Sequence, residues 1–331
     1  MIKGTTSNTP NSFKNRINKI NVFNSNWLLV LTLNNYMRYF FLMMLFFSFL
    51  QGYAQPTTLL IKGELVIDGN KRSFSTYIPP QSKAGKMPLV ISLHGGFASP
   101  KGMFHLADFR PVADREKFIV VCPASKHIWH DGANVHGIDD VKFIDELISY
   151  IIKTYNADPE RVYVTGISNG GFMTARLACQ LNNRIAAVAI VAATLDIGEG
   201  YDLERPMPAL YMHGTSDPIV GYNGGKLFGR SVYSQDAVID KWVALNNCDK
   251  IPLVTTIPDT ANDGTSILKE EYLNPENGLK VVGYTIVNGG HTWPGGWQYL
   301  PKFIIGKTTQ NLNACEEIWS FFKGYKLTVK S

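Results

Sequence analysis

The chain alternates short apolar runs with amphipathic stretches from residue 60 onward. Runs of four to eight apolar residues between turn residues are typical of buried strands, and apolar residues spaced three or four apart are typical of helices that cover a sheet. The expected strands are residues 64–67, 73–78, 88–93, 118–122, 161–165, 185–191, 210–213 and 281–287. The expected helices are residues 104–117, 141–155, 169–181, 235–245 and 315–322. This alternation predicts one α/β domain, with a mainly parallel sheet and helices on both of its faces.

Three parts of this pattern are the clearest. Asp68-Gly69-Asn70 between the first two runs is a turn signal, so these two strands are expected to pair as a hairpin. Residues 88–93 are almost wholly apolar, as expected for a strand that is buried on both faces. Residues 141–155 carry one apolar face and follow Asp139 and Asp140, either of which can cap a helix N-terminus.

The start of the chain has a different composition. Residues 1–36 are rich in Asn and have no periodicity, and we expect them to lie upstream of the natural start at Met37. In residues 37–54 a basic residue precedes an apolar run, and small residues stand at the −3 and −1 positions of a cleavage site after Ala54. We therefore expect a signal peptide at residues 37–54, one folded domain at residues 55–331, and a secreted or periplasmic protein.

An uncleaved amphipathic anchor that begins at Trp27 is the alternative for the same region. Asn34, Asn35 and Arg38 interrupt that longer apolar run. The apolar run after Arg38 would span only ~18 Å as a helix, which is short of the ~30 Å core of a bilayer. The sequence therefore favours a cleaved signal over a stable membrane anchor.

The formal net charge of +5 comes from the start of the chain. Residues 1–55 contain five of the 32 basic residues and none of the 27 acidic residues, so the remainder is neutral. A neutral body gives no electrostatic reason to expect a nucleic acid or an anionic membrane surface as a partner.

Four cysteines are too few to form a disulfide scaffold in a chain of this length. Cys122 and Cys179 lie in apolar runs and are expected to be buried, whereas Cys248 and Cys315 could pair, which the sequence leaves open. The histidines and cysteines do not show zinc-ligand spacing, so we expect neither a metal nor a cofactor.

A candidate nucleophile lies between an expected strand and an expected helix. Gly166-Ile167-Ser168-Asn169-Gly170 has the Gly-x-Ser-x-Gly pattern, in which the two glycines give room for a sharp turn. Such a turn projects the serine side chain at the sheet edge, and the helix N-terminus favours a developing negative charge. Ser168 is therefore the expected nucleophile. The alternative is an ordinary glycine-rich turn.

A serine nucleophile needs a base, and the base needs an orienting carboxylate. Where the serine follows a strand in this way, the order along the chain is Ser, acid, His. Asp217 lies in a turn after an expected strand and is the expected acid, whereas His213 at the end of that strand is expected to hold the loop. His291 lies in a glycine-rich loop after a late strand and is the expected base. The other histidines precede Ser168 and do not fit this order.

An oxyanion hole for this chemistry needs two backbone N–H groups. One is expected from Asn169, which directly follows the nucleophile. The second is expected from His94-Gly95-Gly96, where small residues let the backbone approach a substrate. Within that loop we prefer Gly96 over Gly95 and Phe97.

Four segments together resemble a known family. They are Leu93-His94-Gly95-Gly96, Gly137-Ile138-Asp139-Asp140-Val141, Gly166-Ile167-Ser168-Asn169-Gly170-Gly171 and Gly290-His291-Thr292-Trp293-Pro294-Gly295. They resemble the poly(hydroxybutyrate) depolymerase and feruloyl esterase group of secreted α/β-hydrolases over nearly all of residues 60–325, and the His-Thr-Trp-Pro-Gly run is the most specific element. The resemblance implies the α/β-hydrolase fold, the same three residues as a catalytic triad, a carboxylic ester of a polyester or an acylated polysaccharide as substrate, and no cofactor.

Two features depart from that family. It often carries a cysteine shortly before the last strand that could pair with one like Cys248, and residues 272–275 have none, which puts such a disulfide in doubt. Residues 296–311, just past His291, form a longer insertion than expected. This insertion either shapes the pocket or is a packed surface loop.

Aromatic residues in the expected catalytic loops indicate the type of substrate. The candidates for substrate contact are Phe97, Trp293, Trp297 and Tyr299, with Trp129 as a further one. Flat rings stack on sugars and on a feruloyl ring. Trp293 can instead be a core residue that anchors the His291 loop. The segment of residues 198–208 is short and mostly polar, so we expect it not to form a lipase-type lid.

The sequence therefore predicts a serine esterase that acts on short or aromatic acyl esters of polysaccharides, of the feruloyl or acetyl esterase type. A poly(hydroxybutyrate) depolymerase is the first alternative. A serine exopeptidase of the same fold is a second, although such enzymes usually carry a gating domain for which this chain has no room. An inactive carbohydrate-binding or adhesive module is a third, from another class.

Overall fold

The computed structural model of the protein describes residues 60–80, 85–132, 139–198 and 200–327. The expected upstream extension, the signal peptide and its cleavage site lie outside these residues, as does the start of the second family-like segment, residues 137–138. Within the described ranges, no helix is both long and apolar enough to cross a membrane.

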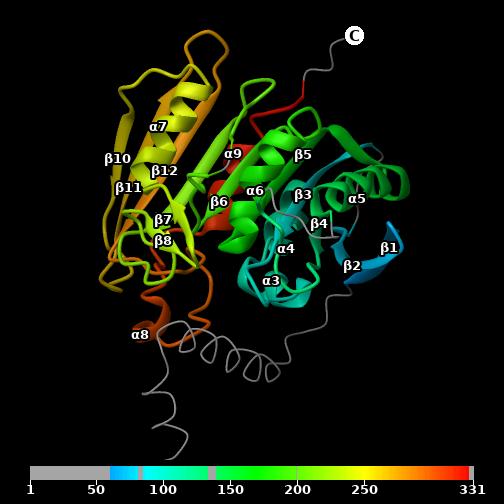
Figure 1. The fold of residues 1–331 in the computed structure, drawn as a ribbon, viewed down its shortest axis with the longest axis horizontal. Helices are drawn as coiled ribbons and strands as arrows, with labels where there is room; N and C mark the ends of the chain where they lie inside the picture. Colours follow the sequence, from blue (N-terminus) through cyan, green and yellow to red (C-terminus); the bar gives the residue numbers. More distant parts are fainter. Residues whose placement is uncertain (1–59, 81–84, 133–138, 199, 328–331) are drawn as a thin grey trace, which may run out of the picture. The chain divides into compact units, whose positions relative to one another are not determined.

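The described apolar runs form one sheet of ten strands and a separate small hairpin (Figure 1). The strands of the large sheet are β1 (Ile61–Ile67), β2 (Asn70–Tyr77), β3 (Met87–Leu93), β4 (Ile119–Pro123), β5 (Ala157–Ile167), β6 (Ala187–Val191), β7 (Ala209–Gly214), β10 (Leu253–Ile257), β11 (Ser266–Leu273) and β12 (Lys280–Val287). The small hairpin consists of β8 (Gly225–Leu227) and β9 (Arg230–Val232). The helices are α3 (Pro100–Leu106), α4 (Arg110–Glu116), α5 (Asp140–Tyr155), α6 (Asn169–Gln180), α7 (Gln235–Leu245), α8 (Lys302–Ile305) and α9 (Ala314–Phe322).

The strand order of the large sheet is β1-β2-β4-β3-β5-β6-β7-β12-β11-β10. The neighbouring strands from β4 to β12 in this order are parallel, whereas β1 and β2 at one edge and β11 and β10 at the other pair antiparallel. The carboxyl ends of the parallel strands therefore meet at the same edge, which is where loops can assemble a site.

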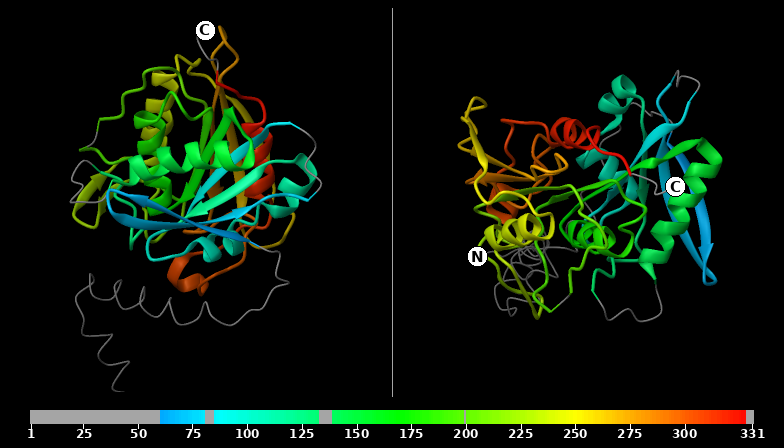
Figure 2. Two further views of the ribbon diagram at one scale, coloured as in Figure 1. Left: turned by 90° about the vertical axis from the view of Figure 1, so that its right-hand side faces the viewer. Right: turned by 90° about the horizontal axis from the view of Figure 1, so that it is seen from above.

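The core consists of two hydrophobic layers, one on each face of the sheet. Successive side chains of a strand point to opposite faces, so Leu89 and Ile91 of β3 join one layer and Val90 joins the other. Helices α5, α6 and α7 cover the first face, and helices α3, α4 and α9 cover the second (Figure 2). The predicted architecture, a mainly parallel sheet with helices on both faces, is confirmed.

Most of the predicted elements form near their expected positions. Asp68 and Gly69 have positive φ angles of 48° and 75° in the turn of the predicted β1–β2 hairpin. Of the two expected caps of α5, Asp139 accepts the Lys142 N–H at 2.9 Å. Asp140 is instead buried, where it bonds Arg72 and His130.

The single helix predicted over residues 104–117 is wrong. The chain forms α3 and α4 instead, separated at residues 107–109. Pro111 stands in the first turn of α4, and proline favours a helix start because it lacks the N–H that a helix interior needs. The Asp108 carboxylate accepts the Arg110 N–H at 3.1 Å and so bonds a backbone donor at the new helix start.

Several elements have no counterpart in the prediction. They are β8, β9, β10, β11 and α8. Strand β10 is an edge strand whose first four residues are exposed, so it lacks the buried apolar run on which strand prediction depends.

The four cysteines are free thiols in this structure. Cys248 belongs to the layer under α7, whereas Cys315 belongs to the layer under α9 on the opposite face. The pairing of these two residues that the sequence left open is therefore not formed.

Candidate active site

Ser168 occupies a strained turn between β5 and α6. Its φ and ψ angles are 56° and −126°, in a region that L-residues rarely adopt. The two flanking glycines are required there, because a Cβ on Gly166 would collide with the backbone of Gly170, and a Cβ on Gly170 would collide with the backbone that follows β3. Strain of this kind persists only where the surroundings enforce it, and it gathers at functional sites.

Asp217 and His291 lie together although 74 residues separate them along the chain. His291 Nδ1 lies 2.8 Å from Asp217 Oδ2, and both side chains are buried. Strands β7 and β12 are parallel neighbours, so the loops that follow them meet at the same sheet edge. The other carboxylate oxygen, Oδ1, accepts the N–H groups of Ile219 and Val220 at 2.8 Å each. Both oxygens of the carboxylate therefore have hydrogen-bonding partners.

His213 is a second histidine on the same carboxylate. Its Nε2 lies 3.3 Å from Asp217 Oδ2 and 2.8 Å from the Val220 carbonyl, and its Nδ1 lies 3.2 Å from Gln235 Oε1. The sequence predicted that His213 holds the loop, and these contacts agree with that interpretation. What sequence reasoning missed is the direct contact with Asp217.

The electrostatics of the three side chains are coupled. Burial alone raises the pKa of the Asp217 carboxyl, but the charges and hydrogen bonds of His291 and His213 outweigh it and hold that pKa well below its usual range. Burial alone lowers the pKa of His213, but its hydrogen bond to Asp217 and the charge of that group raise it above the usual value. Asp217 is therefore ionised over the whole neutral range.

The loop after β3 lies beside the Ser168 turn. A Cβ built on Gly95 would lie 3.5 Å from the Ser168 Cβ, and one built on Gly96 would lie 3.8 Å from the Asn169 Cβ. The Phe97 N–H already donates to the His127 carbonyl at 3.1 Å. The backbone N–H of Phe97 is therefore already engaged. The N–H groups of Gly95 and Gly96 are the two remaining candidates in this loop for the oxyanion hole.

His94 fixes the shape of that loop. Its Nε2 accepts the Ser125 N–H at 3.1 Å, so Nδ1 carries the proton and faces the Gly95 carbonyl at 2.7 Å. The Trp129 indole N–H donates to the His94 carbonyl at 2.9 Å. Burial lowers the pKa of His94, which keeps the ring neutral and this tautomer in place.

The Asn169 side chain connects the nucleophile turn to the loop after β4 and, through that loop, to β9. It accepts the Trp129 N–H at 2.6 Å and donates to the Trp129 carbonyl at 3.0 Å and to the Asp131 carboxylate at 3.1 Å. Asp131 in turn forms two hydrogen bonds of 3.0 Å with Arg230 of β9. Sequence reasoning missed Asp131 and Arg230, and no motif or spacing marks either of them.

The aromatic residues expected at the substrate divide into two groups. Trp293 is only 1% exposed and packs edge-on against Phe109, so its burial argues against substrate contact and assigns it to the core beneath the His291 loop. Trp129 is equally buried. Phe97 and Trp297 remain partly exposed, with Trp297 beside His105 at 4.9 Å. Tyr299 is also a partly exposed residue, and its hydroxyl donates a hydrogen bond to the His291 carbonyl.

The family of the chain follows from comparison with known proteins. The family model described as "Esterase PHB depolymerase" matches residues 72–250, which is more than half of the chain. The chain belongs to the esterase PHB depolymerase family. It is a carboxylic ester hydrolase, and the inactive-module alternative loses its support.

Three relatives show how far this esterase resembles named proteins. It is 27% identical to the predicted esterase NocK of Nocardia uniformis subsp. tsuyamanensis, over 79% of this chain and 82% of that one. It is 33% identical to feruloyl esterase B of Piromyces equi over 54% of this chain, and 32% identical to the bifunctional acetylxylan esterase/xylanase XynS20E of Neocallimastix patriciarum over 46% of this chain. The matches cover only 34% and 22% of the latter two relatives.

A solved structure supports the fold. The acetyl xylan esterase from Aspergillus awamori aligns with a TM-score of 0.50 at 16% identity, over 70% of this esterase and 94% of that chain. At this identity the similarity shows the fold alone, and it confirms the predicted α/β-hydrolase fold.

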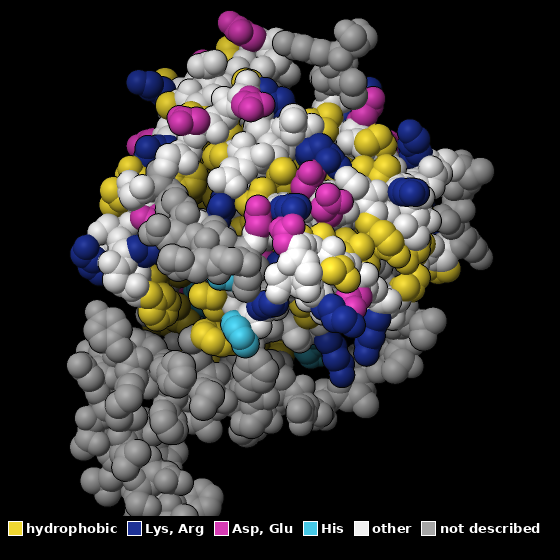
Figure 3. Space-filling view, turned by 45° about the vertical axis from the view of Figure 1, so that its right-hand side comes forward, with side chains coloured by type: hydrophobic (Ala, Val, Ile, Leu, Met, Phe, Trp, Pro, Cys, Tyr) yellow, Lys and Arg dark blue, Asp and Glu magenta, His cyan; other side chains and the backbone are white. Residues whose placement is uncertain are grey.

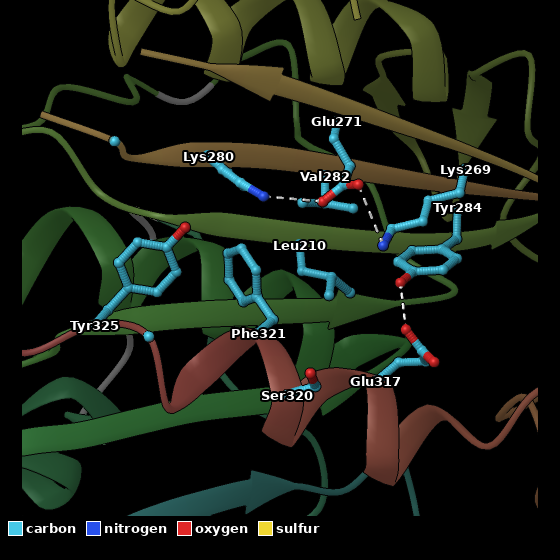
Figure 4. A pocket seen from close by; sticks show the side chains of 12 residues that line it. Leu210, Lys269, Glu271, Lys280, Val282, Tyr284, Glu317, Ser320, Phe321 and Tyr325 are labelled. Carbon is cyan, nitrogen blue, oxygen red and sulfur yellow. Dashed lines mark hydrogen bonds and ion pairs between the residues drawn. The ribbon is translucent and has the colours of Figure 1, made fainter. Parts of the chain in front are cut away.

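A separate pocket of the esterase lies on the face of the sheet that α9 covers (Figure 4). Its charged side chains have partners within the lining. Glu271 lies 3.3 Å from Lys280 and 3.4 Å from Lys269, and Glu317 accepts the Tyr284 hydroxyl at 2.6 Å. None of the three candidate catalytic residues lines it.

On the face drawn in Figure 3, basic and acidic side chains are interspersed.

Proposed function

We propose that this esterase hydrolyses its substrate through an acyl-enzyme formed on Ser168, with His291 as the base and Asp217 as the orienting acid. The observation that carries the proposal is the buried contact of 2.8 Å between His291 Nδ1 and Asp217 Oδ2, at the same sheet edge as the strained Ser168 turn. A carboxylate on Nδ1 fixes the histidine tautomer that leaves Nε2 free to accept a proton.

The reaction then follows in two stages. His291 Nε2 takes the Ser168 hydroxyl proton while Oγ attacks the ester carbonyl carbon. The N–H groups of Asn169 and Gly96 donate to the oxygen that becomes negative. The tetrahedral intermediate expels the alcohol, which receives the proton from His291. Water then gives a proton to His291 and attacks the acyl carbon, the bond from that carbon to Ser168 Oγ breaks, the carboxylic acid leaves, and His291 returns the proton to Oγ.

Covalent labelling with a fluorophosphonate tests this proposal. The wild-type protein is expected to be labelled once, and Ser168→Ala is expected to lose the label while its circular dichroism remains unchanged. Ser216→Ala is a matched control, because Ser216 is an exposed serine next to Asp217. Labelling of the folded Ser168→Ala protein would show that another residue is the nucleophile.

We propose short or aromatic acyl esters of polysaccharides, feruloyl or acetyl, as the substrates. The names of two relatives, feruloyl esterase B and acetylxylan esterase/xylanase, support this class. Phe97 and Trp297 offer partly exposed rings near the catalytic loops. Residues 200–208 contain no helix that could act as a lipase-type lid.

A polyester is the second candidate substrate, and exposed apolar side chains favour it. Phe303, Phe228 and Ile128 are 87%, 64% and 42% exposed, on connections that follow β12, β7 and β4 at the catalytic edge of the sheet. Rates on methyl ferulate, acetylated xylan, a polyhydroxybutyrate film and a long-chain triglyceride separate the candidates. Preference for the film would select the polyester, and preference for the triglyceride would overturn both.

The protein is also proposed to be exported, with residues 37–54 as signal peptide and residues 55–331 as the mature catalytic domain. The composition of the leader supports this proposal. Expression from Met37 in a secreting host is expected to give an N-terminus at or near Gln55. N-terminal sequencing that finds residues 1–36 on the native mature protein would contradict it.

A further inference from the structure

The insertion after His291 forms hydrogen bonds with both backbone polar groups of His291. The His291 N–H donates to the Ile305 carbonyl at 2.6 Å, and the His291 carbonyl accepts the Tyr299 hydroxyl at 2.6 Å. Both partners belong to residues 298–308, which we call the clamp segment. The segment thus satisfies both backbone polar groups of His291.

The clamp segment is itself held in one shape. The Gln298 amide donates to the carbonyls of Leu300 and Gly306 at 2.8 and 2.9 Å, and its oxygen accepts the Thr308 N–H at 2.9 Å. The backbones of Gly290 and Gly306 pack against each other so closely that a Cβ on either would collide with the other. The segment therefore offers a rigid support to the loop that carries His291.

The loop needs such a support because its own sequence supplies little. Gly289 and Gly290 precede His291, and glycine restricts the backbone less than any other residue. The Asp217 contact holds only the ring of His291. A base that has to reach both Asp217 and the nucleophile needs its backbone fixed as well, because small displacements of a catalytic group lower the rate strongly.

We propose that Tyr299 is a positioning residue for the base, and that its hydroxyl fixes the backbone carbonyl of His291. This inference rests on the proposed role of His291. The geometry suits the task, since Tyr299 lies eight residues beyond His291 and returns to it across the clamp segment. Although the residue as a whole is partly exposed, desolvation of its phenol group raises the pKa of Tyr299 far above its usual range, so the phenol stays a hydrogen-bond donor at any working pH.

Tyr299→Phe tests the proposal, because it removes the hydroxyl and keeps the ring. We expect kcat to fall about ten-fold, with KM changed by less than about two-fold. Tyr163→Phe is the matched control, because the Tyr163 hydroxyl donates to the Tyr325 carbonyl at 2.7 Å, away from the candidate catalytic residues. The control is expected to lose stability to a similar extent and to keep its kcat.

A second variant and a spectroscopic signal separate positioning from simple stability. Gln298→Ala loosens the clamp segment without touching His291, and we expect a smaller fall in kcat, about three-fold. The low-field proton resonance of the His291–Asp217 hydrogen bond is expected to broaden in Tyr299→Phe and to stay unchanged in Tyr163→Phe.

The outcomes distinguish this proposal from the proposed function. Full activity of the folded His291→Ala protein would overturn the role of His291 itself. If His291→Ala is inactive but Tyr299→Phe keeps kcat within about two-fold of wild type, only the positioning role fails. Equal losses of kcat in Tyr299→Phe and Tyr163→Phe would also overturn it, because the effect would then come from stability alone.

Discussion

The nucleophile and the acid–base pair are built in different ways. Ser168 lies in one strained turn between β5 and α6, where Gly166 makes room within the turn and Gly170 makes room for the backbone at the end of β3. Asp217 and His291 are far apart in the sequence, and the pairing of β7 with β12 and the clamp segment bring them together. The first arrangement depends mainly on local backbone geometry, and the second depends mainly on contacts between distant segments.

This difference has a physical consequence. A turn for which two glycines make room is disturbed mainly by changes within it, whereas a pair held by distant segments is sensitive to changes in any of them. Substitutions on the acid–base side are therefore expected to affect activity from more positions than substitutions on the nucleophile side. Four predictions test this comparison, beginning with the largest effect.

Ser168→Ala removes the nucleophile and is expected to lower kcat by ~10⁴–10⁶-fold while leaving the fold intact. Steady-state hydrolysis of a soluble aryl ester measures the loss, and thermal unfolding checks the fold. A folded variant with more than a few per cent of the wild-type activity would show that another residue attacks the ester.

Asp217→Asn is expected to lower kcat by about 10⁴-fold, because an amide donates to His291 Nδ1 and stabilises the wrong tautomer. The variant also loses a carboxylate that accepts the N–H groups of Ile219 and Val220. Asp240→Asn, at an exposed position of α7, is the control and is expected to keep full activity. Equal kinetics for the two variants would contradict the assignment of the acid.

Much of the fold and of the proposed site could be predicted from the sequence. The buried parallel strands are recognisable in the sequence as apolar runs, and two glycines at fixed spacing indicate the Ser168 turn. The order of the three residues along the chain then selects Asp217 and His291. Each of these signals is local, or follows from the order of elements in the fold.

The remaining features depend on contacts that no local pattern encodes. The Asp131–Arg230 ion pair joins residues 99 positions apart, and each looks like an ordinary surface charge in the sequence. Tyr299 reads as a substrate-binding aromatic, and only the fold shows that its hydroxyl returns to His291. The division of residues 104–117 into two helices depends on Pro111 and Asp108, which a pattern of apolar spacing ignores.

His213 is expected to make stability depend on pH. Its raised pKa means that its contribution is complete below the unfolded value of ~6.5 and is lost as pH rises through the folded value. The lowered pKa of Asp217 means that its contribution is present above ~3.9 and is lost as pH falls through the folded value. The free energy of unfolding that His213→Gln loses is therefore expected to be largest between about pH 4 and 6.5.

Chemical denaturation at several pH values measures this difference. The loss at its maximum is expected to be about 1–3 kcal/mol, as for other buried groups that lose their partner. His105→Gln, on α3 and outside this network, is the control and is expected to show no such maximum. A loss that does not vary between pH 5 and pH 8 would contradict the electrostatic coupling of His213 to Asp217.

Asn169→Ala tests the nucleophile side of the comparison and carries the smallest expected effect. The substitution keeps the backbone N–H proposed for the oxyanion hole and removes three side-chain hydrogen bonds to Trp129 and Asp131. Because the two glycines that make room for the turn are unchanged, we expect kcat to fall by no more than about ten-fold. That limit lies below the ~10²–10³-fold loss expected when an oxyanion donor itself is removed.

Asn182→Ala is the matched control at the other end of α6. The Asn182 side chain also makes three hydrogen bonds, to the Ala178 carbonyl and to both backbone groups of Arg205, and it lies away from Ser168. Both variants are expected to lose similar stability, and only Asn169→Ala is expected to lose activity. If Asn169→Ala lowered kcat more than Tyr299→Phe, the Ser168 turn would depend on distant loops as strongly as the acid–base pair does, and the contrast between the two arrangements would be wrong.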